Sequence, residues 1–175
     1  MTSRDAVTSR DAVTSGDSDA VAQTGDRQRE FSLRLDDQLC FALYAASRAV
    51  TAVYRPVLDR LGLTYPQYLV MLVLWDHETS LVKDLCAALA LDYGTLSPLL
   101  KRLESTGLLR RERRVDDERS VQVTLTETGA ALRERARAVP AVIGGAMSLS
   151  GDEFVALRTA LRSLTAAVTA TAEAR

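Results

Sequence analysis

Cys40 is the side chain of this 175-residue sequence best suited to chemistry, because a thiol can be oxidised reversibly to a sulfenic acid. Asp36 or Asp37 can cap the helix that begins here, which would place Cys40 in its first turn. The unpaired N–H groups and the dipole of that turn favour a thiolate, whereas the two carboxylates oppose it. The alternative is a buried, inert cysteine in an apolar helix.

Two tyrosines follow Cys40 at spacings that matter for a thiolate. Tyr44 is four residues further on and therefore shares a helical face with Cys40. Tyr54 lies near the same face, but a rise of ~1.5 Å per residue puts it about 21 Å away along the axis. If two such helices pair antiparallel in a dimer, Tyr54 could approach the Cys40 of a second copy, where its phenolic O–H would stabilise a thiolate.

The other thiol and the histidine are isolated. Cys86 lies in the segment LVKDLCAAL, where we expect it to face the core as a small filler. His77 is the lone histidine and has no cluster of ligands around it, so no metal site and no cofactor are expected.

A cluster of basic residues offers a second kind of chemistry, the binding of phosphate groups. The net charge of the chain is −1, so composition alone does not indicate a nucleic-acid partner. Between residues 101 and 114, however, the acidic residues are Glu104 and Glu112, and the basic residues outnumber them. The basic residues are Lys101, Arg102, Arg110, Arg111, Arg113 and Arg114. This excess is a candidate phosphate-facing patch, and the alternative is an ordinary solvated surface.

Length and composition limit the class of protein. The length predicts one domain with a short tail, and 47% hydrophobic with 26% charged residues is typical of a soluble globular protein. No apolar run approaches the ~20 residues of a membrane span, and no secretory signal is evident. We therefore expect a cytoplasmic protein with free thiols. Residues 1–30, which contain TSRDAV twice in tandem, are expected to be a disordered tail.

Helices must position these side chains. Residues 36–62 predict a helix that is apolar nearly all round and therefore buried on several sides, as at a subunit interface. Pro56 should kink it, and Gly62 should end it. Thr64 and Gln67 resemble a capping box that opens the next helix.

A helix-turn-helix is expected after a break at 77–80. Ser80 can cap a short helix over 81–89, and a second helix follows. That second helix could start after Asp92, but Pro98 would then remove an interior hydrogen bond. We therefore predict Thr95 as its N-cap, because Pro98 then falls in the first turn, where its missing N–H matters little.

A charged hairpin and further helices complete the chain. Gly107 should end the preceding helix, and strands are predicted at 109–114 and 120–124. The connection 115–119 is too long and charged for a two-residue turn. Pro140 should kink or end the helix that follows. Two capping boxes open the last helices: Thr124 with Glu127, and Ser150 with Glu153.

The predicted fold is mainly α with a small β-hairpin, a winged helix-turn-helix of six helices and a two-stranded wing. Residues 31–175 form a single domain, in which 64–125 are the winged helix-turn-helix. Residues 36–62 and 126–174 are left as dimerisation helices. The second helix of the motif would enter a major groove of DNA, and an arginine of the wing could enter a minor groove. The alternative for the wing is a self-neutralising surface hairpin.

The predicted DNA-binding residues come from this second helix and from the wing. They are Thr95, Ser97, Lys101, Arg102, Arg111, Arg113, Arg114, Asp117 and Arg119. The apolar residues of the same helix must face inward: Leu96, Leu99, Leu100 and Leu103. At the wing tip, the carboxylate of Asp117 would fix the orientation of the Arg119 guanidinium.

The run LSPLLKRLESTGLLRRERRVDDERSVQVTLTETG at 96–129 resembles the MarR family of dimeric winged-helix regulators. More narrowly, residues 35–50 and 63–78 look like the organic-hydroperoxide-sensing repressors within that family. The resemblance covers 33–167 and implies that Thr95 and Arg102 contact the operator, with Asp117 and Arg119 at the wing tip. Tyr93 is a departure, because the family often has a small hydroxyl residue there.

The resemblance implies a redox-sensing site made of Cys40, Tyr44 and Tyr54 at a subunit junction. A homodimer would bind a pseudo-palindromic operator and repress transcription until an organic hydroperoxide oxidises Cys40 to sulfenic acid. Side chains that could form an apolar wall for the peroxide, or be plain core, are Phe41, Leu43, Tyr68 and Trp75.

Two other functions compete with this hypothesis. One is a MarR-type repressor released by a reversible small ligand such as a phenolic acid, with Cys40 incidental. The other is a thiol peroxidase, which would need an activating Arg or His beside the cysteine and a route to turnover. Arg48 lies eight residues beyond Cys40 and no resolving cysteine is evident, so we expect no enzyme.

Overall fold

The computed structural model describes residues 32–114 and 120–174. The expected tail at 1–30 and the expected wing tip at 115–119 lie outside these residues. By its internal contacts the chain divides after Gln38. The described part before this division holds one 3-10 turn, η1 (Leu35–Asp37), and the side-chain amide of Gln38 donates to the carbonyls of Ser32 and Arg34.

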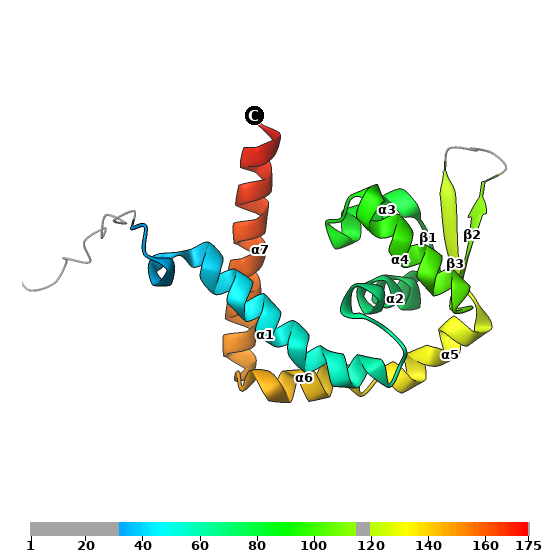
Figure 1. Ribbon diagram of the computed structural model, residues 1–175, viewed down its shortest axis with the longest axis horizontal. Helices are drawn as coiled ribbons and strands as arrows, with labels where there is room; N and C mark the ends of the chain where they lie inside the picture. Colours follow the sequence, from blue (N-terminus) through cyan, green and yellow to red (C-terminus); the bar gives the residue numbers. More distant parts are fainter. Residues whose placement is uncertain (1–31, 115–119, 175) are drawn as a thin grey trace, which may run out of the picture. The chain divides into compact units, whose positions relative to one another are not determined.

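From Leu39 onward, the described residues form seven α-helices and a three-stranded antiparallel sheet (Figure 1). In chain order these are α1 (Leu39–Asp59), α2 (Tyr65–His77), β1 (Thr79–Leu81), α3 (Val82–Leu89), α4 (Tyr93–Ser105), β2 (Leu109–Arg113), β3 (Val121–Leu125), α5 (Glu127–Ala136), α6 (Val139–Met147) and α7 (Gly151–Glu173). The predicted class, mainly α with a small β-sheet, is confirmed. One helix more than expected is present because α5 ends at Ala136 and α6 opens with Pro140 in its first turn, where proline is tolerated.

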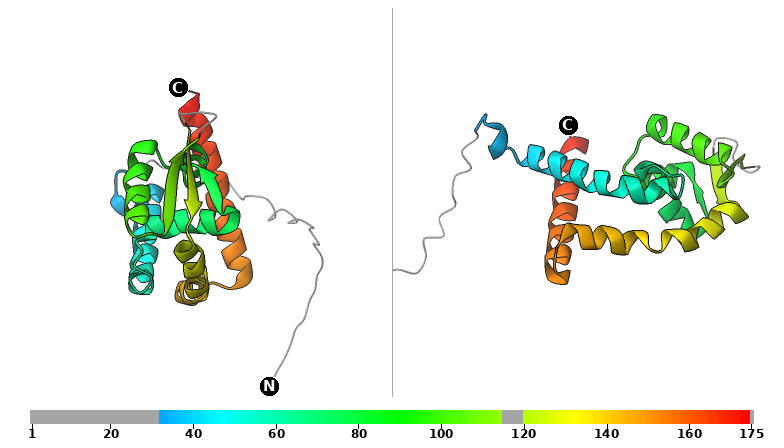
Figure 2. Two further views of the ribbon diagram at one scale, coloured as in Figure 1. Left: turned by 90° about the vertical axis from the view of Figure 1, so that its right-hand side faces the viewer. Right: turned by 60° about the horizontal axis from the view of Figure 1, so that its bottom comes forward.

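The sheet contains one strand that the sequence did not indicate. β3 is central, with β1 on one side and β2 on the other (Figure 2). The expected break at 77–80 was wrong in part, because Ser80 pairs with Val123 and Leu81, not Ser80, is the N-cap of α3. Without β1, the second edge of β3 would expose unpaired peptide groups.

The start of α4 also differs from the prediction. Asp92, not Thr95, is the N-cap, and its carboxylate accepts hydrogen bonds from the Thr95 N–H at 2.8 Å and the Thr95 hydroxyl at 2.7 Å. These bonds, the one from the hydroxyl foremost, hold the pKa of the Asp92 carboxyl below its ordinary value. Pro98 therefore lies inside α4. The carboxylate cap compensates for the hydrogen bond that the proline removes.

The predicted ends of α1 and α4 are confirmed. Gly62 and Gly107 both adopt left-handed backbone conformations, with φ of 70° and 73°. After Gly107, the Leu108 N–H donates to the carbonyl of Leu103 at 3.0 Å, which completes the expected Schellman arrangement.

Capping boxes open two helices as predicted. Gln67 accepts from the Thr64 N–H at 2.8 Å in α2, and Glu153 accepts from the Ser150 N–H at 2.8 Å in α7. The third predicted box was wrong, because Thr124 belongs to β3 and Thr126 caps α5 instead.

A close contact at Gly129 joins α5 to the helix-turn-helix. The indole N–H of Trp75 donates to the Gly129 carbonyl at 2.9 Å. A Cβ at Gly129 would lie 1.9 Å from the carbonyl oxygen of Leu108, so the chain can approach this closely only with glycine. The contact connects α2, the turn between α4 and β2, and the start of α5. The core around it contains the fully buried Leu58, Val70, Met71, Leu74, Leu85, Leu96, Leu100, Leu103, Leu109, Val123 and Val139.

The long helices leave apolar side chains uncovered. Leu58 is the one buried residue of α1, which contacts α2 and α6 (Figure 1). Along α7, every side chain whose burial is described is exposed except that of Leu164, which is half-buried. The exposed large apolar residues of α7 are Phe154, Val155, Leu157, Leu161 and Val168. Within the described residues, neither these helices nor the others combine the length and apolarity of a membrane span.

Candidate DNA interface and cysteine site

α3 and α4 form the predicted helix-turn-helix. Ala90 joins them in a left-handed conformation, and the Leu91 N–H donates to the carbonyl of Cys86 at 3.0 Å. The inward-facing residues of α4 are as expected: Leu96, Leu100 and Leu103 are buried, and Leu99 is half-buried. Lys101 and Arg102 are exposed on the same helix. Their contact with DNA stays a prediction.

Thr95 and Ser97 are less available than the sequence indicated. Thr95 is exposed, but its hydroxyl hydrogen is donated to Asp92, so it has no donor for a phosphate while that bond persists. Ser97 is half-buried in a cleft of about 300 Å³ between α4 and the sheet. The cleft is lined by Val82, Tyr93, Ser97, Leu100, Arg111, Arg113 and Val121. Tyr93, which sequence reasoning left out of the site, is 63% exposed here at the first position of α4.

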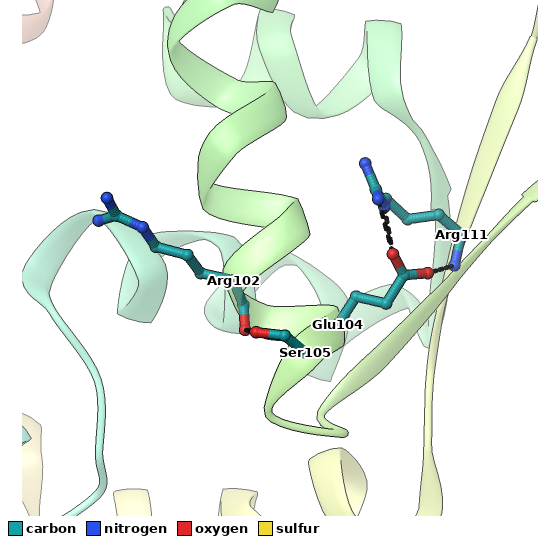
Figure 3. A network of polar contacts seen from close by, with 4 residues as sticks. All are labelled: Arg102, Glu104, Ser105 and Arg111. Atoms are coloured by element: carbon teal, nitrogen blue, oxygen red, sulfur yellow. Dashed lines mark hydrogen bonds and ion pairs between the residues drawn. The ribbon is translucent and has the colours of Figure 1, made fainter.

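Arg111 is held by Glu104 (Figure 3). The carboxylate of Glu104 accepts three hydrogen bonds from this one residue, at 2.9 Å from its backbone N–H, 2.9 Å from Nε and 2.6 Å from Nη2. The hydrogen bonds from the guanidinium are the main reason that the pKa of Glu104 is lowered. Arg111 is thus engaged within the protein, contrary to what a solvent-facing phosphate contact would require.

The other wing residues divide by position. Arg113 is exposed, and the Arg114 N–H donates to the carbonyl of Ser120 at 3.0 Å, which continues the hairpin beyond β2. The predicted wing-tip pair, Asp117 and Arg119, lies outside the described residues.

Cys40 is an exposed free thiol on the second residue of α1. Its predicted place in the first turn is confirmed. α1 begins at Leu39, later than predicted, and the two residues predicted to cap it, Asp36 and Asp37, belong to η1. An exposed thiol in a first turn contacts solvent and lies near unpaired N–H groups.

Tyr44 lies on the same face of α1, one turn from Cys40, and its side chain is 56% exposed. Its hydroxyl accepts a hydrogen bond from Nη1 of Arg48 at 3.0 Å, and the guanidinium carbon lies 5.6 Å from the ring centroid. The phenolic hydrogen is therefore left to donate elsewhere. A nearby thiolate is a suitable acceptor.

Tyr54 belongs to a separate aromatic cluster. Its ring centroid lies 4.6 Å from that of Tyr65 and 5.9 Å from that of Tyr68. Burial, and then the neighbouring phenols, raise the pKa of Tyr54, so its hydroxyl stays protonated and can donate. Because α1 is one continuous helix, Tyr54 remains about 21 Å from its own Cys40, as the residue spacing requires.

Tyr65 was missed by sequence reasoning although its ring contacts that of Tyr54 at a tilted angle. The signal available was its place beside Pro66, in the capping box that opens α2. Tyr65 also lines a groove of about 670 Å³ between α1 and α2, together with Ser47, Arg48, Thr51, Arg55 and Pro66, among others. Tyr54 is half-buried.

The proposed apolar wall is not assembled around Cys40 within one chain. Tyr68 and Trp75 are buried members of the core, which favours the plain structural role for both. Phe41 is exposed and Leu43 half-buried on α1. Cys86 is half-buried and packs against the core, as expected of a small filler.

Comparisons with known proteins agree with this architecture. The family model for the transcriptional regulator SarA/Rot matches residues 52–135. The organic hydroperoxide resistance transcriptional regulator of Bacillus subtilis is 51% identical over 132 residues, which cover 75% of this chain and 90% of that protein.

Solved structures of DNA-binding regulators are also similar to this chain. Reduced AbfR bound to DNA is 34% identical with a TM-score of 0.67, over 79% of this chain and 94% of that one. AbfR, a protein of Staphylococcus epidermidis, has also been solved in a disulfide form, which is 37% identical with a TM-score of 0.54 over 75% of this chain and 93% of that one. The chain belongs to the MarR family of winged-helix, DNA-binding transcriptional regulators, within the group that includes the organic hydroperoxide resistance regulators.

Proposed function

We propose that this regulator is a homodimeric repressor that releases its operator when an organic hydroperoxide oxidises Cys40. The observation that carries the proposal is the exposed thiol in the first turn of α1, on a helix that also exposes large apolar side chains. The 51% identity to a B. subtilis regulator named for organic hydroperoxide resistance supports the choice of oxidant.

The dimer is supported by uncovered apolar surface. α1 exposes Leu39, Phe41 and Val53 among its large hydrophobic residues, and α7 exposes a further set along its length. Monomeric proteins rarely leave long apolar faces in water, and a closed two-fold dimer buries the same faces of both copies. Two copies of the helix-turn-helix, related by a two-fold axis, would recognise a pseudo-palindromic operator.

The dimer would also complete the sensing site. Tyr54 is too far from Cys40 along one α1, but antiparallel packing of two α1 helices brings the Tyr54 of one copy toward the Cys40 of the other. Tyr54 and its neighbour Tyr65 would then supply phenolic hydrogens, together with Tyr44 from the same helix. Donors to the charged form lower the pKa of a thiol and increase the fraction present as thiolate.

The chemical step is a two-electron oxidation. The Cys40 thiolate sulfur attacks one peroxide oxygen, so an S–O bond forms while the O–O bond breaks. The sulfur is oxidised to a sulfenic acid and the peroxide is reduced. The departing alkoxide takes a proton from water and leaves as the alcohol.

Release of DNA would follow from the added oxygen atom. The larger sulfenic acid displaces the phenols from the sulfur, so the hydrogen bonds that hold the two α1 helices are lost. α1 contacts α6, and α5 packs on the helix-turn-helix at Gly129. A shift of α1 would therefore change the spacing between the two α4 helices of the dimer.

Replacing Cys40 by Ser tests the proposal. C40S should bind operator DNA as the unmodified chain does, but cumene hydroperoxide should no longer release it. C86S is the matched control and should still be released. The Cys40 peptide of the oxidised protein should gain the mass of one oxygen atom. Release of C40S by the peroxide would refute oxidation of Cys40 as the trigger, and release of both proteins by a phenolic acid alone would favour the reversible-ligand function instead.

A further inference from the structure

The ion pair between Glu104 and Arg111 connects the two elements that are expected to read DNA. Glu104 lies in the last turn of α4, and Arg111 is the central residue of β2, the first strand of the wing. Both side chains are half-buried, with exposed fractions of 34% and 27%. The pair therefore connects the recognition helix to the base of the wing.

The carboxylate of Glu104 fixes backbone as well as side chain. β2 is an edge strand, because β3 is its one neighbour in the described sheet. An edge strand leaves every second N–H without a partner strand. One oxygen of Glu104 accepts from the Arg111 N–H on this edge, and the other oxygen accepts from Nε and Nη2 of the same residue. The strand thus cannot slide or rotate against α4 without breaking charge-assisted hydrogen bonds.

The same hydrogen bonds occupy the Arg111 guanidinium, which is therefore poorly placed to bind a DNA phosphate. Arg111 uses its planar fork on one carboxylate oxygen, and the neighbouring negative charge neutralises it. The side chain of Arg102, by contrast, extends on the other side of α4 in Figure 3. The hydrogen bond drawn at Arg102 involves its backbone carbonyl, which accepts from the Ser105 hydroxyl at 2.8 Å.

We propose that Glu104 and Arg111 form a positioning brace that sets the wing relative to the recognition helix, and that Arg111 promotes DNA binding through this brace and not as a phosphate contact. The reason is geometric: α4 and the wing must enter different grooves together, so a small change in the angle between them moves the end of the hairpin out of reach. The acidic residue is as necessary as the basic one, although it carries the charge that DNA repels.

Salt dependence separates a brace from a phosphate contact. A residue that neutralises one phosphate contributes about 0.9 to the slope of log affinity against log salt concentration. The probe is a duplex of about 30 base pairs, long enough for two half-sites, selected from a random pool by the full unmodified chain. Affinities are measured from about 50 to 200 mM salt, the range in which the slope is well defined.

For a brace, E104Q and R111A should each weaken binding by about tenfold, equivalent to ~1.4 kcal/mol, with the slope unchanged. The double variant should bind no more weakly than either single one, because both remove the same contact. R111K is the sharpest variant, since lysine keeps the charge but not the fork. A brace predicts that R111K binds as weakly as R111A.

R102A is the matched control from the same helix, and a phosphate contact there should lower the slope by about 0.9. The melting temperature and the active fraction of each variant, from stoichiometric titration, separate a changed affinity from partial unfolding. The brace would be overturned if R111A lowered the slope by about 0.9 while R111K retained binding and E104Q bound as tightly as the unmodified chain.

Discussion

The hydroxyl of Thr95 donates to the carboxylate of Asp92 over 2.7 Å, so a residue predicted to meet DNA also closes the first turn of the recognition helix. The Thr95 N–H donates to the same carboxylate at 2.8 Å. Stability at the start of α4 and the orientation of its DNA-facing side chains are therefore coupled. A change at Asp92 should affect both.

Asp92→Ala should lower the melting temperature and weaken DNA binding, because the N–H groups at the start of α4 lose their acceptor. The pKa of Asp92 is lowered in the folded chain from an ordinary value of 3.8, so its stabilising contribution is complete above that value and is lost as the pH falls through the folded pKa. The melting temperature of the variant should therefore change less than that of the unmodified chain as the pH is lowered from neutral to 3. Asp92→Asn, which keeps an oxygen acceptor, should remain close to the unmodified chain at neutral pH, and an equally large loss in that variant would contradict the capping role.

Tyr54→Phe should slow the oxidation of Cys40 by an organic hydroperoxide. Without the phenolic donor the reacting sulfur loses a hydrogen bond to its charged form, which is worth about 1.5 kcal/mol, so the rate should fall about tenfold. The measurement is the rate of sulfenic acid formation with cumene hydroperoxide. Tyr68→Phe, in the same aromatic cluster but buried, is the control and should react at the normal rate.

Gly129→Ala should destabilise the fold by roughly 2–4 kcal/mol, because the new Cβ overlaps the Leu108 carbonyl and the backbone must move. The variant should also bind DNA poorly, since the contact docks α5 on the helix-turn-helix. Gly145→Ala is the matched control in α6, where a Cβ meets nothing within 4 Å, and helix propensity predicts a gain of about 0.5–1 kcal/mol. Urea unfolding of both variants checks the prediction, and equal effects of the two would disprove it.

Leu161→Glu should dissociate the proposed dimer. Leu157, Leu161, Leu164 and Val168 lie on one stripe of α7, and a buried carboxylate within an apolar interface carries a large desolvation cost. Sedimentation velocity at micromolar concentration should show monomer and weaker operator binding. Ala166→Glu places the same charge on the opposite face and should stay dimeric. A dimer in both variants would show that this stripe of α7 is not the interface.

Much of the fold could be predicted because its signals are local. The left-handed turns at Gly62 and Gly107 and the capping boxes at Thr64 and Ser150 depend on residues a few positions apart. The inward face of α4 follows from leucine spacing, and the first-turn place of Cys40 follows from the start of an apolar helix. The motif around Arg111 was sufficient to identify the family.

The errors arose where a distant residue supplies a partner or where two local effects oppose each other. β1 exists because β3, over forty residues later, offers a second edge at Val123. The start of α4 depended on whether the stabilisation by a carboxylate cap at Asp92 exceeds the cost of the hydrogen bond lost at Pro98. The spacing of the residues does not decide between the two. The sequence places Arg111 among positive charges, but the opposite charge that neutralises it belongs to another element. Alternation alone could not show that Glu104 faces it.

The sequence by itself determined the winged-helix class, the family, and the position of a thiol at the start of a long apolar helix, since each depends on residue types at short spacings. Only the tertiary structure decided which of the candidate side chains remain available. It pairs Arg111 of β2 with Glu104 of α4 and brings the ring of Tyr54 against that of Tyr65. The physical reason is that hydrogen bonds and ring contacts depend on distances across the fold, which the order of residues along the chain does not specify.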